Sequence, residues 1–176
     1  MFADRYWALT PPPLSPAMQS CLTDDGSLTE RLIATGRDFT VRVLYQGPSV
    51  AAPDENGLIG VETGAPVLAR HVALLLDGVA VVVARSIARH GCPQWEPVLA
   101  RGSRSLGLTL FGEDSAIIRE PLHYCALSTG HPLFPLARGQ DLEDAPRYAA
   151  RRSNFLSHGA ALNVCEVFLP VLESFL

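Results

Sequence analysis

Two arginines lie within apolar, β-branched segments, where a charged side chain needs a partner. The runs 67–76 and 79–86 are joined by Asp77-Gly78, a strong signal for a two-residue hairpin turn. That turn predicts a register in which Arg70 lies opposite Arg85 on an apolar face. Because like charges destabilise a sheet, a carboxylate-bearing ligand between them is one explanation. The other is that both side chains extend to solvent at the sheet edge, and the residues alone do not separate the two.

A carboxylate interrupts a second apolar stripe. The run 160–169 presents Glu166 on the same face as aliphatic and aromatic residues. In a dry pocket a carboxylic acid can donate or accept a proton near neutral pH. However, a two-residue turn at His158-Gly159 places Arg151 opposite Glu166, and cross-strand ion pairs are more common than catalytic glutamates. From the residues alone, the ion pair is the favoured interpretation.

Other reactive residue types form weaker patterns. His90-Gly91-Cys92 and His123-Tyr124-Cys125 are His-x-Cys pairs, but their spacing is not a usual zinc pattern, and we predict no metal site. A metal-dependent hydrolase would need these pairs to converge. There is no nucleophile elbow and no phosphate-binding glycine loop, and 112–115 is typical of a turn. We therefore predict an activity without covalent or nucleotide chemistry.

The elements that position these residues follow from capping and turn signals. Ser15-Pro16 and the capping box Ser27 to Glu30 predict short helices at 16–22 and 28–35. Alternation and β-branched runs predict the strands, whereas proline and glycine predict a surface loop over 131–146. The strands are expected at 39–46, 67–76, 79–86, 122–128, 147–156 and 160–169, with another short helix at 105–111. The pattern predicts an α+β fold, one domain over 1–176 with an extended lead-in at 1–14 and an antiparallel sheet.

Composition narrows the functional classes. The 176 residues suit one domain with a real core, since 48% are hydrophobic. A net charge of -4 at pH 7 and a pI near 5.7 argue against a nucleic-acid partner. The first residues lack a signal-peptide pattern, and no apolar run is long enough to span a bilayer. Four scattered cysteines fit free thiols, so we expect a cytoplasmic protein without membrane insertion. We also expect it to be a monomer.

Ordered segments of the chain resemble the chorismate lyase family of ubiquinone biosynthesis. The similarity covers most of the chain after the lead-in. The matching segments, in order, are Asp25-Gly26-Ser27-Leu28-Thr29-Glu30-Arg31-Leu32, Val67-Leu68-Ala69-Arg70, Asp77-Gly78, Ala84-Arg85-Ser86, Leu106-Gly107, Leu110-Phe111-Gly112, Ala150-Arg151-Arg152-Ser153 and Cys165-Glu166-Val167-Phe168-Leu169-Pro170. They include both arginines and the glutamate discussed above.

This resemblance implies helical flaps that close over an enclosed ligand site on an antiparallel sheet. It implies a carbon-oxygen lyase that splits chorismate into 4-hydroxybenzoate and pyruvate without metal or cofactor. By family analogy, Arg70 holds the ring carboxylate with backbone groups of Leu28 and Leu106. Glu166 meets the 4-hydroxyl end, and Arg85 helps to hold the enolpyruvyl carboxylate. The catalytic residues are then Arg70 and Glu166.

Departures from the family pattern are expected to affect packing around the site. His71 follows Arg70 where an acidic or polar residue is common, and Tyr148-Ala149 replaces a stretch with a tryptophan. The sequence leaves three roles open for Glu166: an acid that assists the leaving group, a base at C4, or a residue that only positions the hydroxyl.

The alternative function is a non-catalytic module that binds an aromatic acid, because the same fold resembles effector domains of transcription regulators. Those regulators carry an N-terminal winged helix. Only two short helices are expected before the first strand, which favours the enzyme.

Overall fold

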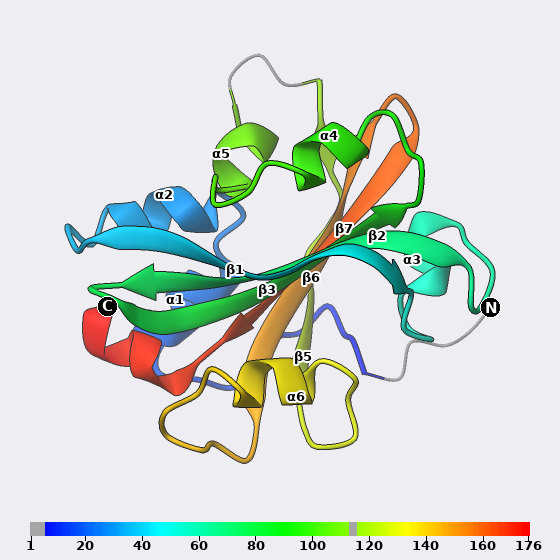
Figure 1. Cartoon of the computed structure of the whole chain (residues 1–176). Helices are drawn as coiled ribbons and strands as arrows, with labels where there is room; N and C mark the ends of the chain where they lie inside the picture. The colour runs from blue at the N-terminus through cyan, green and yellow to red at the C-terminus, as the bar shows by residue number, and fades with distance from the viewer. Residues whose placement is uncertain (1–5, 113–115) are drawn as a thin grey trace.

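Seven strands form one antiparallel sheet in the computed structural model, which describes residues 6–112 and 116–176 (Figure 1). Across the sheet the order is β1 (Phe39–Val50), β2 (Pro66–Leu76), β3 (Val79–Arg89), β7 (Ala160–Phe168), β6 (Tyr148–Ser157) and β4 (Ile118–Arg119), and β5 (His123–Leu127) also pairs with β6. The α+β class and the antiparallel sheet are confirmed. The predicted turn at 112–115 lies outside the described residues except for Gly112.

Short helices precede, connect and follow the strands. They are α1 (Pro16–Thr23), α2 (Leu28–Ile33), α3 (Asn56–Ile59), α4 (Glu96–Leu99), α5 (Gly107–Leu110), α6 (Phe134–Arg138) and the 3-10 helix η1 (Pro170–Phe175). Figure 1 shows α2, α4 and α5 on one side of the sheet and α6 on the other. Within the described residues, no helix is long and apolar enough to span a bilayer.

The capping signals identified the first two helices correctly. The Ser15 hydroxyl accepts a hydrogen bond from the backbone N–H of Met18, and the Ser27 hydroxyl accepts one from that of Glu30. A serine cap of this kind stabilises a helix by about 1 kcal/mol. In contrast, α6 lies within the stretch predicted as a surface loop. Phe134 and Ala137 of α6 are buried against the sheet, so tertiary packing stabilises a helix that proline-rich local sequence does not predict.

Both predicted hairpin turns are present. Asp77 and Gly78 have φ values of 50° and 79°, and His158 and Gly159 have 49° and 78°. Positive φ at both central positions is the conformation that joins strands with a right-handed twist. The second hairpin keeps its register without interruption, with Arg151 opposite Glu166. The first contains a bulge: Leu75 pairs with Ala80 but Leu74 pairs with Val82.

The bulge overturns the predicted pairing of the two arginines. Beyond it, Arg70 lies opposite Ser86, and Arg85 lies opposite His71. Because neighbouring strand residues point to opposite faces, Arg70 and Arg85 lie on different sides of the sheet. The expectation of two opposed arginines is therefore wrong.

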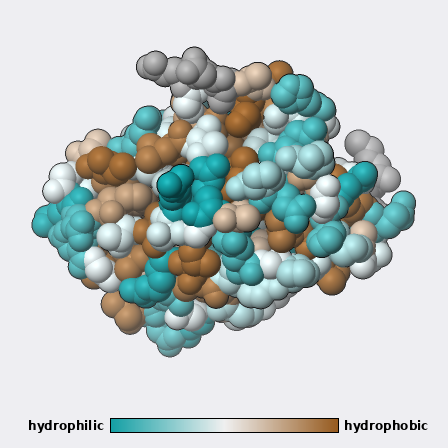
Figure 2. Space-filling view, turned by 45° about the horizontal axis from the view of Figure 1, so that its top comes forward, coloured by the Kyte–Doolittle hydropathy of each residue, from teal (hydrophilic) through white to brown (hydrophobic). Residues whose placement is uncertain are grey.

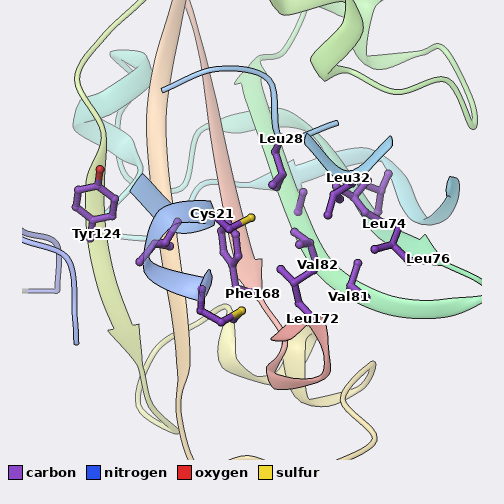
Figure 3. Packing of buried hydrophobic residues seen from close by; sticks show 14 residues of the cluster. Cys21, Leu28, Leu32, Leu74, Leu76, Val81, Val82, Tyr124, Phe168 and Leu172 are labelled. Carbon is purple, nitrogen blue, oxygen red and sulfur yellow. The ribbon is translucent and has the colours of Figure 1, made fainter. Parts of the chain in front are cut away.

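The two faces of the sheet are covered separately. We name the face of Arg70, Ser86 and Glu166 the pocket face, and the face of His71 and Arg85 the α6 face. Helices α1, α2 and η1 pack on the pocket face through one apolar cluster, part of which is shown in Figure 3, where Cys21, Phe168 and Leu172 lie close together. Helices α4 and α5 pack on the same face through a second cluster. The candidate site lies where these two clusters meet, because residues of both line it.

Candidate active site

A hollow of about 580 Å³, which includes the space at its mouth, lies between the pocket face and the helices above it. Its floor is formed by strands β1, β2, β3, β6 and β7, and its roof by α2 and by the chain from Ser105 to Phe111. The lining residues are Leu28, Thr29, Val41, Arg70, Val72, Leu74, Ala84, Ser86, Ser105, Leu106, Gly107, Leu110, Phe111, Arg119, Leu122, Arg152, Ser153, Phe155, Val164 and Glu166. Four of the five predicted site residues, namely Leu28, Arg70, Leu106 and Glu166, are brought together here.

Apolar side chains make up most of this lining, whereas the outer surface is mixed. Figure 2 shows hydrophobic and hydrophilic residues interspersed on the side where α4 and α5 come forward. Of the charged groups that line the hollow, Arg70 is buried, whereas Arg119 and Glu166 are half-buried. Under these conditions electrostatic interactions are stronger than at the surface.

Arg70, on β2, is a charged residue of the floor. Its side chain is almost fully buried, and its Nη2 donates to the carbonyl oxygens of Gly102 and Arg104 at 2.8 and 2.9 Å. The buried Nε has no hydrogen-bond partner, and no carboxylate in the described residues forms an ion pair with this guanidinium. Burial, together with the nearby positive charge of Arg101, lowers the pKa of Arg70. A buried cation with a free donor is a receptor for an anion.

The roof closes through direct contacts between α2 and the start of α5. The Thr29 and Ser105 hydroxyls lie 2.6 Å apart and share a hydrogen bond. Gly107 packs so closely against α2 that a Cβ there would lie 2.6 Å from Thr29 Oγ1. Only glycine allows this approach without a shift of the roof. The two short helices, distant in sequence, thus cover the hollow as one unit.

Leu28 and Leu106 contribute both apolar side chains and backbone groups. Both residues are buried, and each stands at the N-terminal end of a roof helix, where backbone N–H groups have no acceptor within the helix. Neither N–H donates to another described residue. Two residues that line the roof thus have backbone N–H groups without an acceptor among the described residues.

Glu166 both forms an ion pair and lines the hollow. Its Oε2 accepts a hydrogen bond from Arg151 Nε at 2.6 Å, which confirms the cross-strand pair favoured by the sequence. Arg151 is fixed in turn, because its Nη1 donates to carbonyl oxygens at the end of α1, including Leu22 at 3.2 Å and Asp24 at 2.5 Å. The other oxygen of Glu166 has no partner among the described residues. The carboxylate is thus held in place with one oxygen left to accept a hydrogen bond from a ligand.

Arg85, the fifth predicted residue, is not part of this hollow. Its guanidinium lies on the α6 face, where Nε and Nη2 donate to the two carboxylate oxygens of Glu55 at 2.7 and 2.8 Å. Its Nη1 lies 2.7 Å from His71 Nε2, and its Nη2 also donates to the Val50 carbonyl. Burial alone would lower the pKa of Arg85, but the hydrogen bonds and charge of Glu55 raise it above its ordinary value. These contacts leave the arginine with a structural partner and hold the segment after β1 against the sheet.

Sequence reasoning missed a further cation of the hollow, Arg119. It stands in the two-residue strand β4, which is too short to show a periodic pattern. Ser86 and Ser153 also line the hollow and were not singled out. In the part of the chain that the structure describes, no group of three or more histidine, cysteine or acidic residues is placed to hold a metal ion.

Comparison with known proteins identifies the family of the chain. The family model described as "Chorismate lyase" matches residues 10–174. A probable chorismate pyruvate-lyase 1 of Burkholderia pseudomallei is 39% identical over 167 residues, covering 93% of this chain and 89% of the relative. A probable chorismate pyruvate-lyase of Aromatoleum aromaticum is 41% identical over 175 residues, covering 94% and 92%.

Solved structures are similar in fold at low sequence identity. A crystal structure of the PhnF C-terminal domain matches with a TM-score of 0.56 and 16% identity, covering 79% of this chain and 87% of that domain. The effector domain of PhnF from Mycobacterium smegmatis matches with a TM-score of 0.51 and 20% identity, covering 82% and 89%. These structures show the fold alone. The match of the family model and the identity to curated relatives show that this chain belongs to the chorismate lyase family.

Proposed function

We propose that this chain is a chorismate pyruvate-lyase that splits chorismate into 4-hydroxybenzoate and pyruvate. The observation that carries the proposal is the buried Arg70 guanidinium, whose Nε is unpaired inside a largely apolar hollow. An aromatic or cyclohexadiene acid suits this environment, because its ring packs against the apolar walls and its carboxylate can accept a hydrogen bond from the unpaired Arg70 Nε. The names of the curated relatives support the same substrate.

The reaction needs little covalent help. Chorismate loses the hydrogen at C4 while the C3–O bond breaks, and the electron pair of the C4–H bond becomes the new ring double bond. The enolpyruvate leaves with the oxygen and takes up a proton to give pyruvate. Because the ring becomes aromatic, the reaction has a strong driving force. Positioning and charge placement are then the tasks left to the protein, and we propose a carbon-oxygen lyase that uses no cofactor.

The residues of the hollow divide this work. Arg70 binds the ring carboxylate, with the backbone N–H groups of Leu28 and Leu106 donating from the roof. The free oxygen of Glu166 accepts a hydrogen bond from the 4-hydroxyl group, and Arg151 holds Glu166 in that position. The contact between Thr29 and Ser105 keeps the roof closed, which excludes water from the ring.

The role of Glu166 in proton transfer is part of this proposal. As a carboxylate fixed by Arg151, Glu166 is placed to accept a proton from C4 or to orient the hydroxyl. A protonated Glu166 that assists the leaving group is the third role. The kinetic test in the Discussion separates transfer from orientation.

The direct experiment is incubation of the purified protein with chorismate in buffer that contains a chelator. We expect 4-hydroxybenzoate and pyruvate in equal amounts. Formation of 3-hydroxybenzoate, or a strict need for added metal, would contradict the proposal. A non-catalytic aromatic-acid module would bind 4-hydroxybenzoate and release no pyruvate from chorismate.

We further propose that the protein works as a monomer in the cytoplasm, with chorismate and 4-hydroxybenzoate as its small-molecule partners. Light scattering of the purified protein at assay concentration measures the oligomeric state directly.

A further inference from the structure

Chorismate carries two carboxylates, and the proposed site so far accounts for one of them. Arg70 suits the ring carboxylate. The residue expected for the enolpyruvyl carboxylate, Arg85, lies on the opposite face of the sheet in an ion pair with Glu55. A dianion placed in the hollow with only one cation would leave a carboxylate without a charged partner in an apolar environment, which is costly.

Arg119 is the second arginine of the hollow without an acidic partner. Its Nε donates to the Ser153 hydroxyl at 3.0 Å, and its Nη1 donates to the backbone carbonyl oxygens of Asp25 and Gly26. Its Nη2 has no hydrogen-bond partner in the described part of the chain. The contacts therefore fix the guanidinium and leave one of its nitrogens free.

Aromatic rings set the position of this guanidinium further. Its central carbon lies 5.2 Å from the centroid of the Phe111 ring and 5.4 Å from that of the Phe155 ring. Both rings line the hollow. Cation–π contacts of this kind help to hold the guanidinium at the wall of the hollow.

The charge of Arg119 is poorly compensated. Among the residues that the structure describes, no carboxylate lies within ion-pair distance of it. Burial, together with the positive charge of Arg151, lowers its pKa despite the more distant charges of Glu166 and Asp25. Arg152 also borders the hollow, but its side chain points to the α6 face, where it forms an ion pair with Asp54. Of the lining arginines in the described residues, Arg70 and Arg119 are therefore the two without a carboxylate.

We infer that Arg119 binds the enolpyruvyl carboxylate of the substrate, an inference that rests on the proposed function. Arg119 then distinguishes substrate from product, because 4-hydroxybenzoate has lost this carboxylate. After the C3–O bond breaks, Arg119 holds pyruvate, while Arg70 still holds the ring acid.

The test compares two unreactive ligands that differ in one carboxylate. The dianion is 3-(carboxymethoxy)-4-hydroxybenzoate, and the monoanion is 3-ethoxy-4-hydroxybenzoate. In Arg119→Met we expect affinity for the dianion to fall about 10- to 100-fold, the effect of losing a hydrogen bond between charged groups, while affinity for the monoanion changes little. Arg119→Lys should recover part of the loss, because it keeps the charge but not the fork.

The matched control is Arg89→Met. Arg89 is an exposed arginine at the end of β3 that donates to the Gly60 carbonyl, and it does not line the hollow. It should leave both affinities unchanged. Isothermal titration calorimetry gives the affinities, and melting temperatures are measured on the same preparations.

The outcomes separate the inference from the proposed function. Equal loss of both affinities in Arg119→Met, with a lower melting temperature, would show that Arg119 only holds the segment at Asp25 and would overturn the inference. An unchanged dianion affinity would overturn it as well. If the parent protein does not turn over chorismate but still prefers the dianion through Arg119, the proposed function fails and the inference about the dicarboxylate stands.

Discussion

On the α6 face, Arg85 and Arg152 each contact a carboxylate, from Glu55 and Asp54 respectively. On the pocket face, Arg151 pairs with Glu166, but Arg70 and Arg119 contact no carboxylate among the described residues. Both faces of the sheet thus carry arginines. Among the described residues, those without a carboxylate partner lie on the pocket face.

This difference separates arginines that are already paired within the fold from arginines that an anionic ligand could pair with. A buried ion pair already satisfies its own charges, so a ligand gains little from it. The two ion pairs of the α6 face offset the burial of their arginines to different extents. Burial lowers the pKa of Arg152 to about 10 even beside Asp54, whereas the bidentate contact with Glu55 raises the pKa of Arg85. The unpaired N–H donors of the pocket-face arginines can form hydrogen bonds to an anionic ligand.

The largest expected effect is loss of a partner on the α6 face. Glu55→Ala leaves Arg85 buried without a carboxylate and removes the acceptor of the Ala52 N–H. We expect the free energy of unfolding to fall by about 3–5 kcal/mol. Urea denaturation measures this loss.

The control for that substitution is Glu62→Ala, at an exposed glutamate on the surface. Turnover per folded molecule should stay near that of the parent in both variants. A Glu55→Ala protein of normal stability but poor turnover would show that the α6 face takes part in the reaction. It would contradict the assignment of the α6-face arginines to the fold.

Next in size is Glu166→Gln on the pocket face. Glutamine keeps the shape of the side chain and an oxygen for Arg151 but cannot take up the proton. If Glu166 transfers a proton, kcat should fall about 100-fold or more while chorismate binding stays largely intact. Steady-state kinetics and the melting temperature are measured on one preparation.

Arg151→Ala is the matched change on the other side of this ion pair. If the pair is only structural, both variants lose stability and keep nearly normal turnover in the folded fraction. In that case Glu166 has no part in proton transfer, and the enzyme works by positioning and electrostatics.

A smaller effect is expected from Arg70→Met, which keeps most of the side-chain volume. Since Arg70 has no carboxylate partner, the variant should lose affinity for 4-hydroxybenzoate by about 10- to 100-fold with little change in melting temperature. Arg70→Lys should restore only part of that affinity. A strongly lowered melting temperature with normal product binding would make Arg70 structural.

The smallest expected effect concerns His71 on the α6 face. Burial and the charge of Arg85 lower the pKa of His71 below its ordinary value of 6.5. As the pH falls, the unfolded chain therefore takes up this proton first, so the stability that neutral His71 contributes is complete above about pH 6.5 and is lost below it.

His71→Gln removes this titration. Its unfolding free energy should fall less between about pH 7 and about pH 5 than that of the parent. Chemical denaturation at several pH values provides the comparison. Parallel pH dependences in both proteins would show that His71 titrates normally in the folded state.

Local sequence signals determined most of the elements of this protein. The serine caps predicted α1 and α2, and the Asp77-Gly78 and His158-Gly159 turns predicted the two hairpins. The register of the second hairpin also followed from its turn, so the ion pair between Arg151 and Glu166 was predictable. A tight turn sets the register of its hairpin as long as no bulge interrupts the pairing, and the second hairpin has none.

Tertiary structure decided which arginines reach the hollow. In the first hairpin, residues 72–76 and 81–84 are buried on both faces of the sheet. A continuously apolar strand carries no alternation, so its sequence does not reveal a one-residue bulge, and that bulge turned Arg85 to the α6 face. Arg119 reaches the hollow only because β4 pairs with β6, and the roof closes only because Thr29 meets Ser105 across 76 positions of the chain. Contacts of such long range depend on how the whole sheet packs, and no local pattern encodes them.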